Sequence, residues 1–136
     1  MPFDQADVEL VEIDWLKAHE MVVEKKVDEL HRMTLRWQGY TKPLLVDSRT
    51  GTILDGHHRF TVGQRMELRR IPVILIDYLT DSGIGVETWP SAELECISKE
   101  EVISMALSGE LYPPKTSRHV IEGHLPPIMV PLESLV

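Results

Sequence analysis

The most informative segment of the sequence is Ile53-Leu54-Asp55-Gly56-His57-His58-Arg59. Its apolar residues end a predicted strand, the flexible glycine permits a turn, and the residues that follow open a predicted helix. A helix N-terminus exposes unpaired N–H groups and the positive end of the helix dipole, and both attract anions. Arginine adds a planar group that matches phosphate oxygens. We therefore predict a phosphate-handling site at this turn.

A plain turn is the alternative explanation for this segment. Asp-Gly pairs are common in turns, and Asp is a frequent N-cap residue. His57, His58 and Arg59 argue against it, because three cationic or titratable groups in the first helical turn oppose the helix dipole unless an anion binds there. Asp55 would repel that anion unless it binds a metal ion or handles a proton.

Composition indicates an ordinary globular protein. With 136 residues, 43% of them hydrophobic and 26% charged, the sequence fits one domain, which we expect to span residues 1–136. No apolar run approaches the roughly 20 residues that span a bilayer, and the first five residues do not resemble a signal peptide. A single cysteine, Cys96, excludes an internal disulfide. We therefore expect no membrane partner and a cytoplasmic location.

The charge balance argues against nucleic acid as a partner. The formal net charge is −8, from 22 acidic and 14 basic side chains. Nucleic-acid-binding proteins usually present a basic face, whereas the basic residues here are sparse and scattered. A small anionic ligand held by a few local positive charges remains compatible with this balance.

Hydrophobic periodicity predicts an α+β domain. We expect strands over residues 8–13, 43–47, 52–54, 71–77 and 86–89, and a proline-rich edge strand over 126–132. We expect helices over about 21–37, from 57 to about 66, and over 98–109. Gly39 should end the first helix, and Ser98 and Glu101 should form a capping box on the third. The 71–77 run is the richest in β-forming residues, which predicts a central strand.

Two other polar features are candidates for function. The segment Lys115-Thr116-Ser117-Arg118-His119 has donors that could hold a carboxylate or phosphate, or it could be a solvated loop. Glu20, next to His19, is by itself an ordinary acidic residue before the first helix. Trp37 and Trp89 are most simply explained as core aromatics.

Together these features resemble a known fold and family. The 53–59 segment, with the strand before it and the helix after it, resembles the ParB/sulfiredoxin-like fold, which implies a small mixed sheet with helices packed on it. Within that fold the string from Asp55 to Arg59 resembles the free L-serine kinases, which phosphorylate the amino acid serine. Those kinases carry a catalytic glutamate where this sequence has His19-Glu20. Their C-terminal substrate-binding segment resembles residues 114–119. The resemblance extends from about residue 8 to 132.

Other proteins of this fold match less well. Sulfiredoxins place a catalytic cysteine before the His-Arg of this loop, where this sequence has Gly56 and His57, so that reductase chemistry is excluded. DNA-partitioning ParB proteins add a helix-turn-helix domain, for which 136 residues leave no room. Some serine kinases of this type are longer, so this chain would be a compact version. The alternatives are a nucleotide-binding ParB-like regulatory protein and a DNA-associated protein, both without kinase turnover.

The resemblance implies a role for each candidate residue. Glu20 would accept the proton of the serine hydroxyl, and Asp55 would assist it or hold Mg²⁺. Residues expected to bind the nucleotide phosphates or the transferring phosphoryl group are Gly56, His57, His58 (also counted as catalytic), Arg59 and Lys26. Residues expected to hold L-serine are Trp89, Thr116, Ser117, Arg118 and His119. Arg118 would face the carboxylate of the serine. The donor would be ATP or ADP, and the sequence does not decide between them. It also leaves open whether the protein forms a homodimer and whether homoserine or threonine can replace serine as the substrate.

Overall fold

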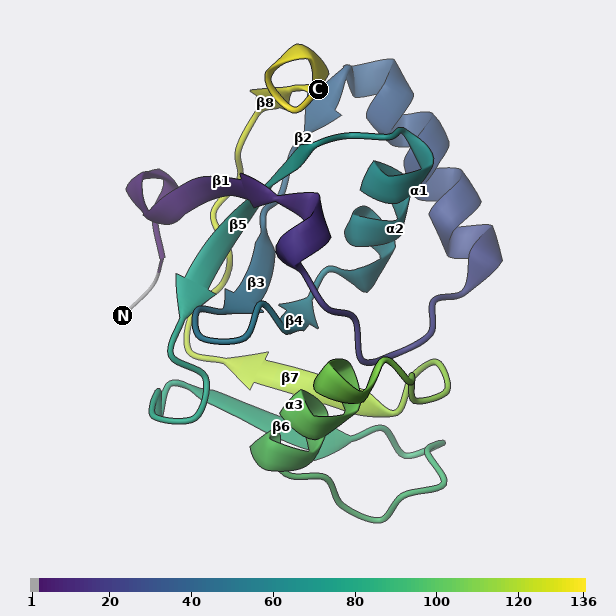
Figure 1. Ribbon diagram of the computed structural model, residues 1–136, viewed down its shortest axis with the longest axis vertical. Coiled ribbons are helices and arrows are strands. Elements are labelled where there is room, and N and C mark those ends of the chain that lie inside the picture. The colour runs from purple at the N-terminus through teal and green to yellow at the C-terminus, as the bar shows by residue number, and fades with distance from the viewer. Residues whose placement is uncertain (1–2) are drawn as a thin grey trace.

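A four-stranded mixed sheet lies at the centre of the structure, a computed structural model that describes residues 3–136 (Figure 1). Its strands, in spatial order, are β1 (Val8–Glu12), β5 (Arg70–Ile76), β3 (Leu44–Asp47) and β4 (Ile53–Asp55). Strand β5 pairs antiparallel with β1 and parallel with β3, while β3 and β4 are antiparallel. The predicted mixed sheet and the predicted central strand are therefore confirmed. Met1 and Pro2, part of the segment used to exclude a signal peptide, lie outside the described residues.

Both faces of this sheet are buried. Successive side chains of a strand point to opposite faces, so alternate residues of β3 and β5 enter two different apolar clusters. One cluster includes Leu44, Val46, Ile71 and Val73. The other includes Leu45, Ile74 and Ile76. The near-continuous apolar runs of these two strands thus reflect coverage on both sides.

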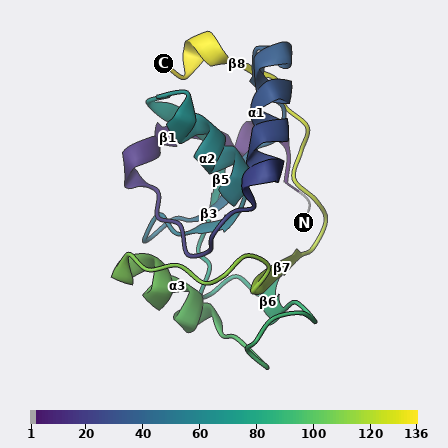
Figure 2. The ribbon, with the colours of Figure 1, turned by 90° about the vertical axis from the view of Figure 1, so that its right-hand side faces the viewer.

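Helices α1 (Glu24–Trp37) and α2 (His57–Arg65) lie side by side beside the sheet (Figures 1 and 2). Helix α1 buries Val27 and Thr34. It begins three residues later than predicted, and its last turn ends at Gln38 in the left-handed conformation, with φ of 57°. The prediction that Gly39 ends the helix was wrong, because Gly39 already pairs as the first residue of β2 (Gly39–Tyr40).

The lower part of the molecule in Figure 1 contains an antiparallel ribbon and one helix. The ribbon pairs β6 (Ile84–Thr88) with β7 (Ser117–Ile121) in continuous register. Helix α3 (Lys99–Ser108) begins with the predicted capping box, in which Ser98 and Glu101 exchange hydrogen bonds. Strand β7 was not predicted, because its first residues are polar; in the structure its side chains alternate in burial along the ribbon.

The C-terminal segment is less regular than predicted. Of the expected 126–132 strand, only β8 (Val130–Pro131) pairs, and it pairs with β2. Proline lacks the N–H that a strand ladder needs, which explains the short pairing. Short 3-10 helices complete the chain at η1 (Gln5–Asp7), η2 (Ile13–Trp15) and η3 (Leu132–Ser134). No helix within residues 3–136 is both long enough and apolar enough to cross a membrane.

Candidate functional site

Three segments that are far apart in the sequence line one pocket of about 450 Å³. The loop between β1 and α1 contributes Glu20, the β4–α2 turn contributes residues 54–58, and the start of β7 contributes residues 117–119. Met21, Val23, Lys26, Trp89, Pro114 and Lys115 complete the lining. A larger pocket of about 950 Å³, between β5, β6 and the N-terminal residues, contains none of the candidate residues.

The structure brings ten of the twelve candidate residues to this pocket and leaves two outside it. The ten are Glu20, Lys26, Asp55, Gly56, His57, His58, Trp89, Ser117, Arg118 and His119. Arg59 instead donates through Nη2 to the carbonyl oxygen of Pro43 at 3.3 Å and lies 3.6 Å from Oδ2 of Asp55. Thr116 is buried, and its hydroxyl donates to the carbonyl oxygen of Pro113. Arg59 and Thr116 therefore contact residues beside the pocket without lining it.

Gly56 shapes the turn between β4 and α2. Its φ of +109° is a conformation that residues with a Cβ atom rarely adopt, and a Cβ there would lie 2.6 Å from Cγ of Leu44. Gly56 is also the N-cap of α2, and no side chain caps the helix. Asp55 is therefore not an N-cap residue, and the plain capping explanation of the Asp-Gly pair does not hold. The uncapped end of α2 lines the pocket.

We expect Gly56→Ala to destabilise the protein by roughly 3 kcal/mol, from backbone strain and from the contact with Leu44. Gly109→Ala is a matched control. Gly109 also has a positive φ, +81°, but a Cβ there meets nothing within 4 Å, so strain alone should cost about 1 kcal/mol. Urea unfolding followed by circular dichroism measures both. If both variants lost the same free energy of unfolding, Gly56 would not be sterically constrained.

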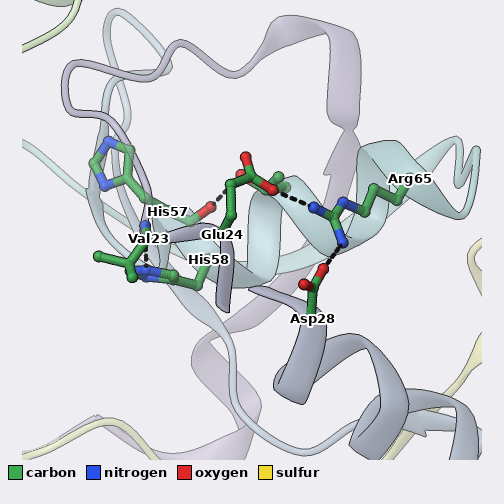
Figure 3. A network of polar contacts seen from close by, with 7 residues as sticks. Val23, Glu24, Asp28, His57, His58 and Arg65 are labelled. Atoms are coloured by element: carbon green, nitrogen blue, oxygen red, sulfur yellow. Dashed lines mark hydrogen bonds and ion pairs between the residues drawn. The ribbon is translucent and has the colours of Figure 1, made fainter. Parts of the chain in front are cut away.

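His57 and His58 hold the loop that carries Glu20. The Nε2 atom of His57 accepts the backbone N–H of His19 at 3.2 Å. The Nε2 atom of His58 accepts that of Val23, also at 3.2 Å (Figure 3). Burial lowers the pKa of each imidazole. Both rings are therefore neutral, and they do not oppose the helix dipole as the sequence-based argument assumed.

Arg65 ties the start of α1 to the end of α2. Its guanidinium pairs with Glu24, and its Nη1 lies 2.6 Å from Oδ1 of Asp28 (Figure 3). These groups are largely exposed, so the pairs contribute modestly to stability. Their position fixes the first turn of α1, from which Lys26 reaches the pocket.

Glu20 connects the two halves of the pocket. Its Oε1 atom accepts the backbone N–H of Ser117 at 2.8 Å and the hydroxyl of Ser117 at 2.9 Å. The backbone around Glu20 pairs with Tyr112, which accepts from Met21 and donates to His19, both at 2.8 Å. The carboxylate therefore stands at a fixed point between the central sheet and the β6–β7 ribbon.

Three imidazoles pack together at the pocket, and two of them, His57 and His119, line it. The ring of His19 lies 4.5 Å from that of His57 and 5.9 Å from that of His119. His19 is fully buried, and burial lowers its pKa to about 4. Burial likewise lowers the pKa of His119 to about 3, and its Nε2 is 2.8 Å from the hydroxyl of Tyr78. The sequence analysis gave His19 and Tyr78 no role, because no local pattern indicates which elements they join.

Trp89 and Arg118 form the rim of the pocket. The indole Nε1 of Trp89 donates to the carbonyl oxygen of Ser117 at 3.1 Å, and the guanidinium carbon of Arg118 lies 5.2 Å from the indole ring centre. Arg118 also lies 3.5 Å from Glu87. Trp37 is 40% exposed and Trp89 36% exposed, so the prediction that both are core aromatics was wrong. Trp89 instead presents an aromatic face and a nearby cation to the pocket.

The pocket has limited capacity for a metal ion. Within the described residues, no group of three or more His, Cys, Asp or Glu side chains is placed to hold one. Asp55 and Glu20 both line the pocket, and the Asp55 side chain is about half exposed, at 51%. Mg²⁺ often binds through one or two carboxylates together with substrate phosphates. Asp55 therefore fits Mg²⁺ as a partner of a phosphate ligand, not as part of a preformed protein cage.

Comparisons with known proteins point to one group. No family model matches the chain. The ADP-dependent L-serine kinase SerK of Thermococcus kodakarensis is 30% identical over 93 residues, which cover 65% of this chain and 38% of that protein. An ATP-dependent L-serine kinase of Desulfurococcus mucosus is 31% identical over 93 residues, covering 65% and 36%. The aligned part of the chain thus spans less than half the length of these relatives.

Solved structures show the same fold over the whole chain. A free serine kinase in complex with AMP has a TM-score of 0.87 and 21% sequence identity, covering 100% of this chain and 96% of that one. A C-terminally truncated SbnI from Staphylococcus aureus has a TM-score of 0.75 and 15% identity, covering 94% and 88%. The predicted fold is therefore confirmed.

Proposed function

The chain is homologous to the free serine kinases, and from this premise we propose that it transfers a phosphoryl group from ATP or ADP to free L-serine, giving O-phosphoserine. The observation that carries the proposal is the shared pocket. It joins Glu20, the uncapped N-terminus of α2 and the donor-rich start of β7. We assign to them the roles of a base, an anion site and, through Arg118, a site for the carboxylate of the amino acid, which is what phosphoryl transfer to serine requires.

In the proposed reaction, the hydroxyl oxygen of L-serine attacks the terminal phosphorus of the nucleotide. A new O–P bond forms while the bond between that phosphorus and the bridging oxygen breaks, and the shortened nucleotide leaves. Glu20 accepts the proton of the hydroxyl as a general base. Most of the rate enhancement comes from positioning the reactants and from neutralising charge on the phosphoryl group.

The start of α2 is the proposed phosphate site. Its first N–H groups and the helix dipole favour an anion. Because Nε2 of His58 and of His57 accepts a backbone N–H, each neutral ring carries its proton on Nδ1, which leaves a donor for other partners. Lys26 adds a positive charge at the edge of the pocket. Asp55 would hold Mg²⁺, which would neutralise the phosphate oxygens.

The start of β7 and the rim are the proposed site for L-serine. Arg118 is half exposed and presents a guanidinium suited to the carboxylate. Trp89 and His119 supply the walls on either side of it. Thr116, whose hydroxyl is engaged by Pro113, would shape this segment without touching the substrate.

The direct test is to incubate the protein with L-serine, Mg²⁺ and either ADP or ATP, and to detect O-phosphoserine by ³¹P NMR. We expect product with at least one donor, and homoserine and threonine should be compared as substrates. One methyl group changes binding by only about 1–3 kcal/mol, so both are real competitors. Nucleotide binding without any phosphorylated amino acid would contradict the proposal and favour a regulatory ParB-like protein. Salt-sensitive binding to DNA would favour a DNA-associated protein.

Lys26→Ala should weaken nucleotide binding about tenfold, because a hydrogen bond to a charged phosphate is lost. Lys25→Ala is a matched control, since Lys25 is the neighbouring exposed lysine and does not line the pocket. Isothermal titration calorimetry with ADP and ATP measures both variants. If the two variants weaken binding equally, Lys26 acts only through the overall charge.

Three aspects of the proposal concern the protein as a whole. We propose that its ligands are a nucleotide and L-serine, with no membrane or nucleic-acid partner. A cytoplasmic location stays a prediction from the sequence, and the sequence leaves a homodimer open. Light scattering of the purified protein would settle the oligomeric state.

A further inference from the structure

Ser117 lies between the carboxylate of Glu20 and the buried ring of His19. Its Oγ atom is 2.9 Å from Oε1 of Glu20 and 2.9 Å from Nε2 of His19. Its backbone N–H reaches the same Oε1 atom at 2.8 Å. Three polar groups from the β1–α1 loop and from β7, 97 and 98 residues apart in the sequence, thus form one continuous chain.

The number of protons fixes the direction of this chain. The Ser117 hydroxyl has one proton and donates it to the Glu20 carboxylate, which when ionised only accepts hydrogen bonds. Its oxygen can then only accept from His19. His19 must therefore carry its proton on Nε2. Its Nδ1 atom has no hydrogen-bond partner of regular geometry within the described residues, and the backbone of Ile53 only partly offsets the lowering of the pKa of His19 by burial. A neutral ring with one proton meets this requirement, as expected for a fully buried imidazole.

We propose that Ser117 and His19 are positioning residues for Glu20, in an assignment that rests on the proposed kinase function. His19 donates from Nε2 to Ser117, and Ser117 donates with its hydroxyl and its N–H to Oε1 of Glu20. Both donors hold the same oxygen of the carboxylate. Among residues 3–136, Oε2 receives no hydrogen bond, so it is the atom left to take the proton of the serine hydroxyl. Ser117 then acts through Glu20, and it does not contact the amino acid.

This arrangement predicts a spectroscopic signature that needs no activity. Long-range ¹H–¹⁵N NMR of the intact protein distinguishes the two neutral tautomers of a histidine. His19 should be the Nε2–H tautomer, and its Nε2 resonance should shift in Ser117→Ala. A proton on Nδ1 in the wild-type protein would overturn the proposal, whether or not the protein is a kinase.

Kinetics separate positioning from substrate binding. Ser117→Ala keeps the backbone N–H and removes the hydroxyl, so kcat should fall about tenfold while the KM for L-serine and for the nucleotide changes little. Ser134→Ala, at an exposed serine of η3, should leave both constants unchanged. A large rise in the KM for L-serine with unchanged kcat would instead place Ser117 in contact with the substrate and overturn the proposal.

Two variants of His19 complete the test. His19→Gln offers an N–H donor near the place of Nε2, whereas His19→Leu fills the site without one. We expect Gln to keep several-fold more of kcat than Leu at matched folded fractions, which urea unfolding would establish. Equal activity of the two would overturn the positioning role of His19. If wild-type protein makes no phosphoserine while the tautomer is as expected, the kinase proposal fails and the hydrogen-bond chain stands.

Discussion

Glu20→Gln should lower the rate of O-phosphoserine formation by roughly 10²–10⁴-fold, the usual cost of losing a general base. The amide oxygen of Gln can still accept both hydrogen bonds from Ser117, so the side chain keeps its position. What it loses is the ability to take a proton. The fall should therefore appear in kcat, measured with saturating L-serine and nucleotide, with little change in either KM.

Two further variants decide whether the fall belongs to Glu20. Glu12→Gln makes the same chemical change on the exposed edge of β1, away from the pocket, and should retain wild-type activity. Asp55→Asn tests the other carboxylate of the pocket. Because we assign Asp55 to Mg²⁺, this variant should reduce the dependence of the rate on Mg²⁺ concentration. If Glu20→Gln stays within a few-fold of wild type while Asp55→Asn is inactive, Asp55 is the base.

The sequence predicted those parts of the fold that depend on residues close together in the chain. Strand β5 is buried on both faces, so nearly all of its residues are apolar, and this continuous apolar run indicated a central strand. Ser98 and Glu101 form their capping box from residues three positions apart, which needs no tertiary contact. The β4–α2 turn likewise depends on a single glycine and its neighbours.

Long-range pairing accounts for what the sequence did not predict. Strand β7 begins with polar residues and becomes a strand only because β6 lies beside it. Helix α1 ends at Gln38 because Gly39 pairs with Pro131, far away in the chain. His19 gains its place from Ser117, 98 residues later. Periodicity within a short window contains no information about such partners.

Ten of the twelve candidate residues, taken from the sequence motifs and from the resemblance to serine kinases, line one pocket, but the resemblance did not give the direction of the side chains. It grouped Arg59 with the phosphate ligands, whereas the Arg59 guanidinium turns toward Pro43 and Asp55. In the sequence, the two histidines at the start of α2 counted as cationic or titratable groups beside the helix dipole. In the structure burial lowers the pKa of both, and each accepts a backbone N–H, so both rings are neutral. Protonation and orientation depend on the surrounding packing, which a motif does not specify.

Acidification should destabilise the fold steeply between about pH 6.5 and pH 4. Burial holds the pKa of His19 at about 4 and that of His119 at about 3, below the value of 6.5 that both have when unfolded. Above pH 6.5 both rings are neutral in either state, so their contribution to stability is fully present. As the pH falls, the unfolded chain takes up protons on His19 and His119 that the native fold excludes, and roughly 3 kcal/mol is lost per pH unit from these two rings. Burial also lowers the pKa of His57, so this third ring adds to the loss. Below pH 4, His19 protonates in the native state as well, and the loss becomes less steep.

A decline of this size is a large part of the 5–15 kcal/mol that stabilises a typical domain, so unfolding should begin near pH 5. Urea unfolding at pH 7.5, 6.5 and 5.5, followed by far-UV circular dichroism, would measure the slope. His19→Gln removes one of the titrating rings and should reduce the slope by about 1.4 kcal/mol per pH unit. His124→Gln removes an exposed histidine outside the cluster and should leave it unchanged. Equal stability at pH 7.5 and 5.5 would mean that the rings take up protons equally in the native and unfolded states, so that burial does not lower their pKa.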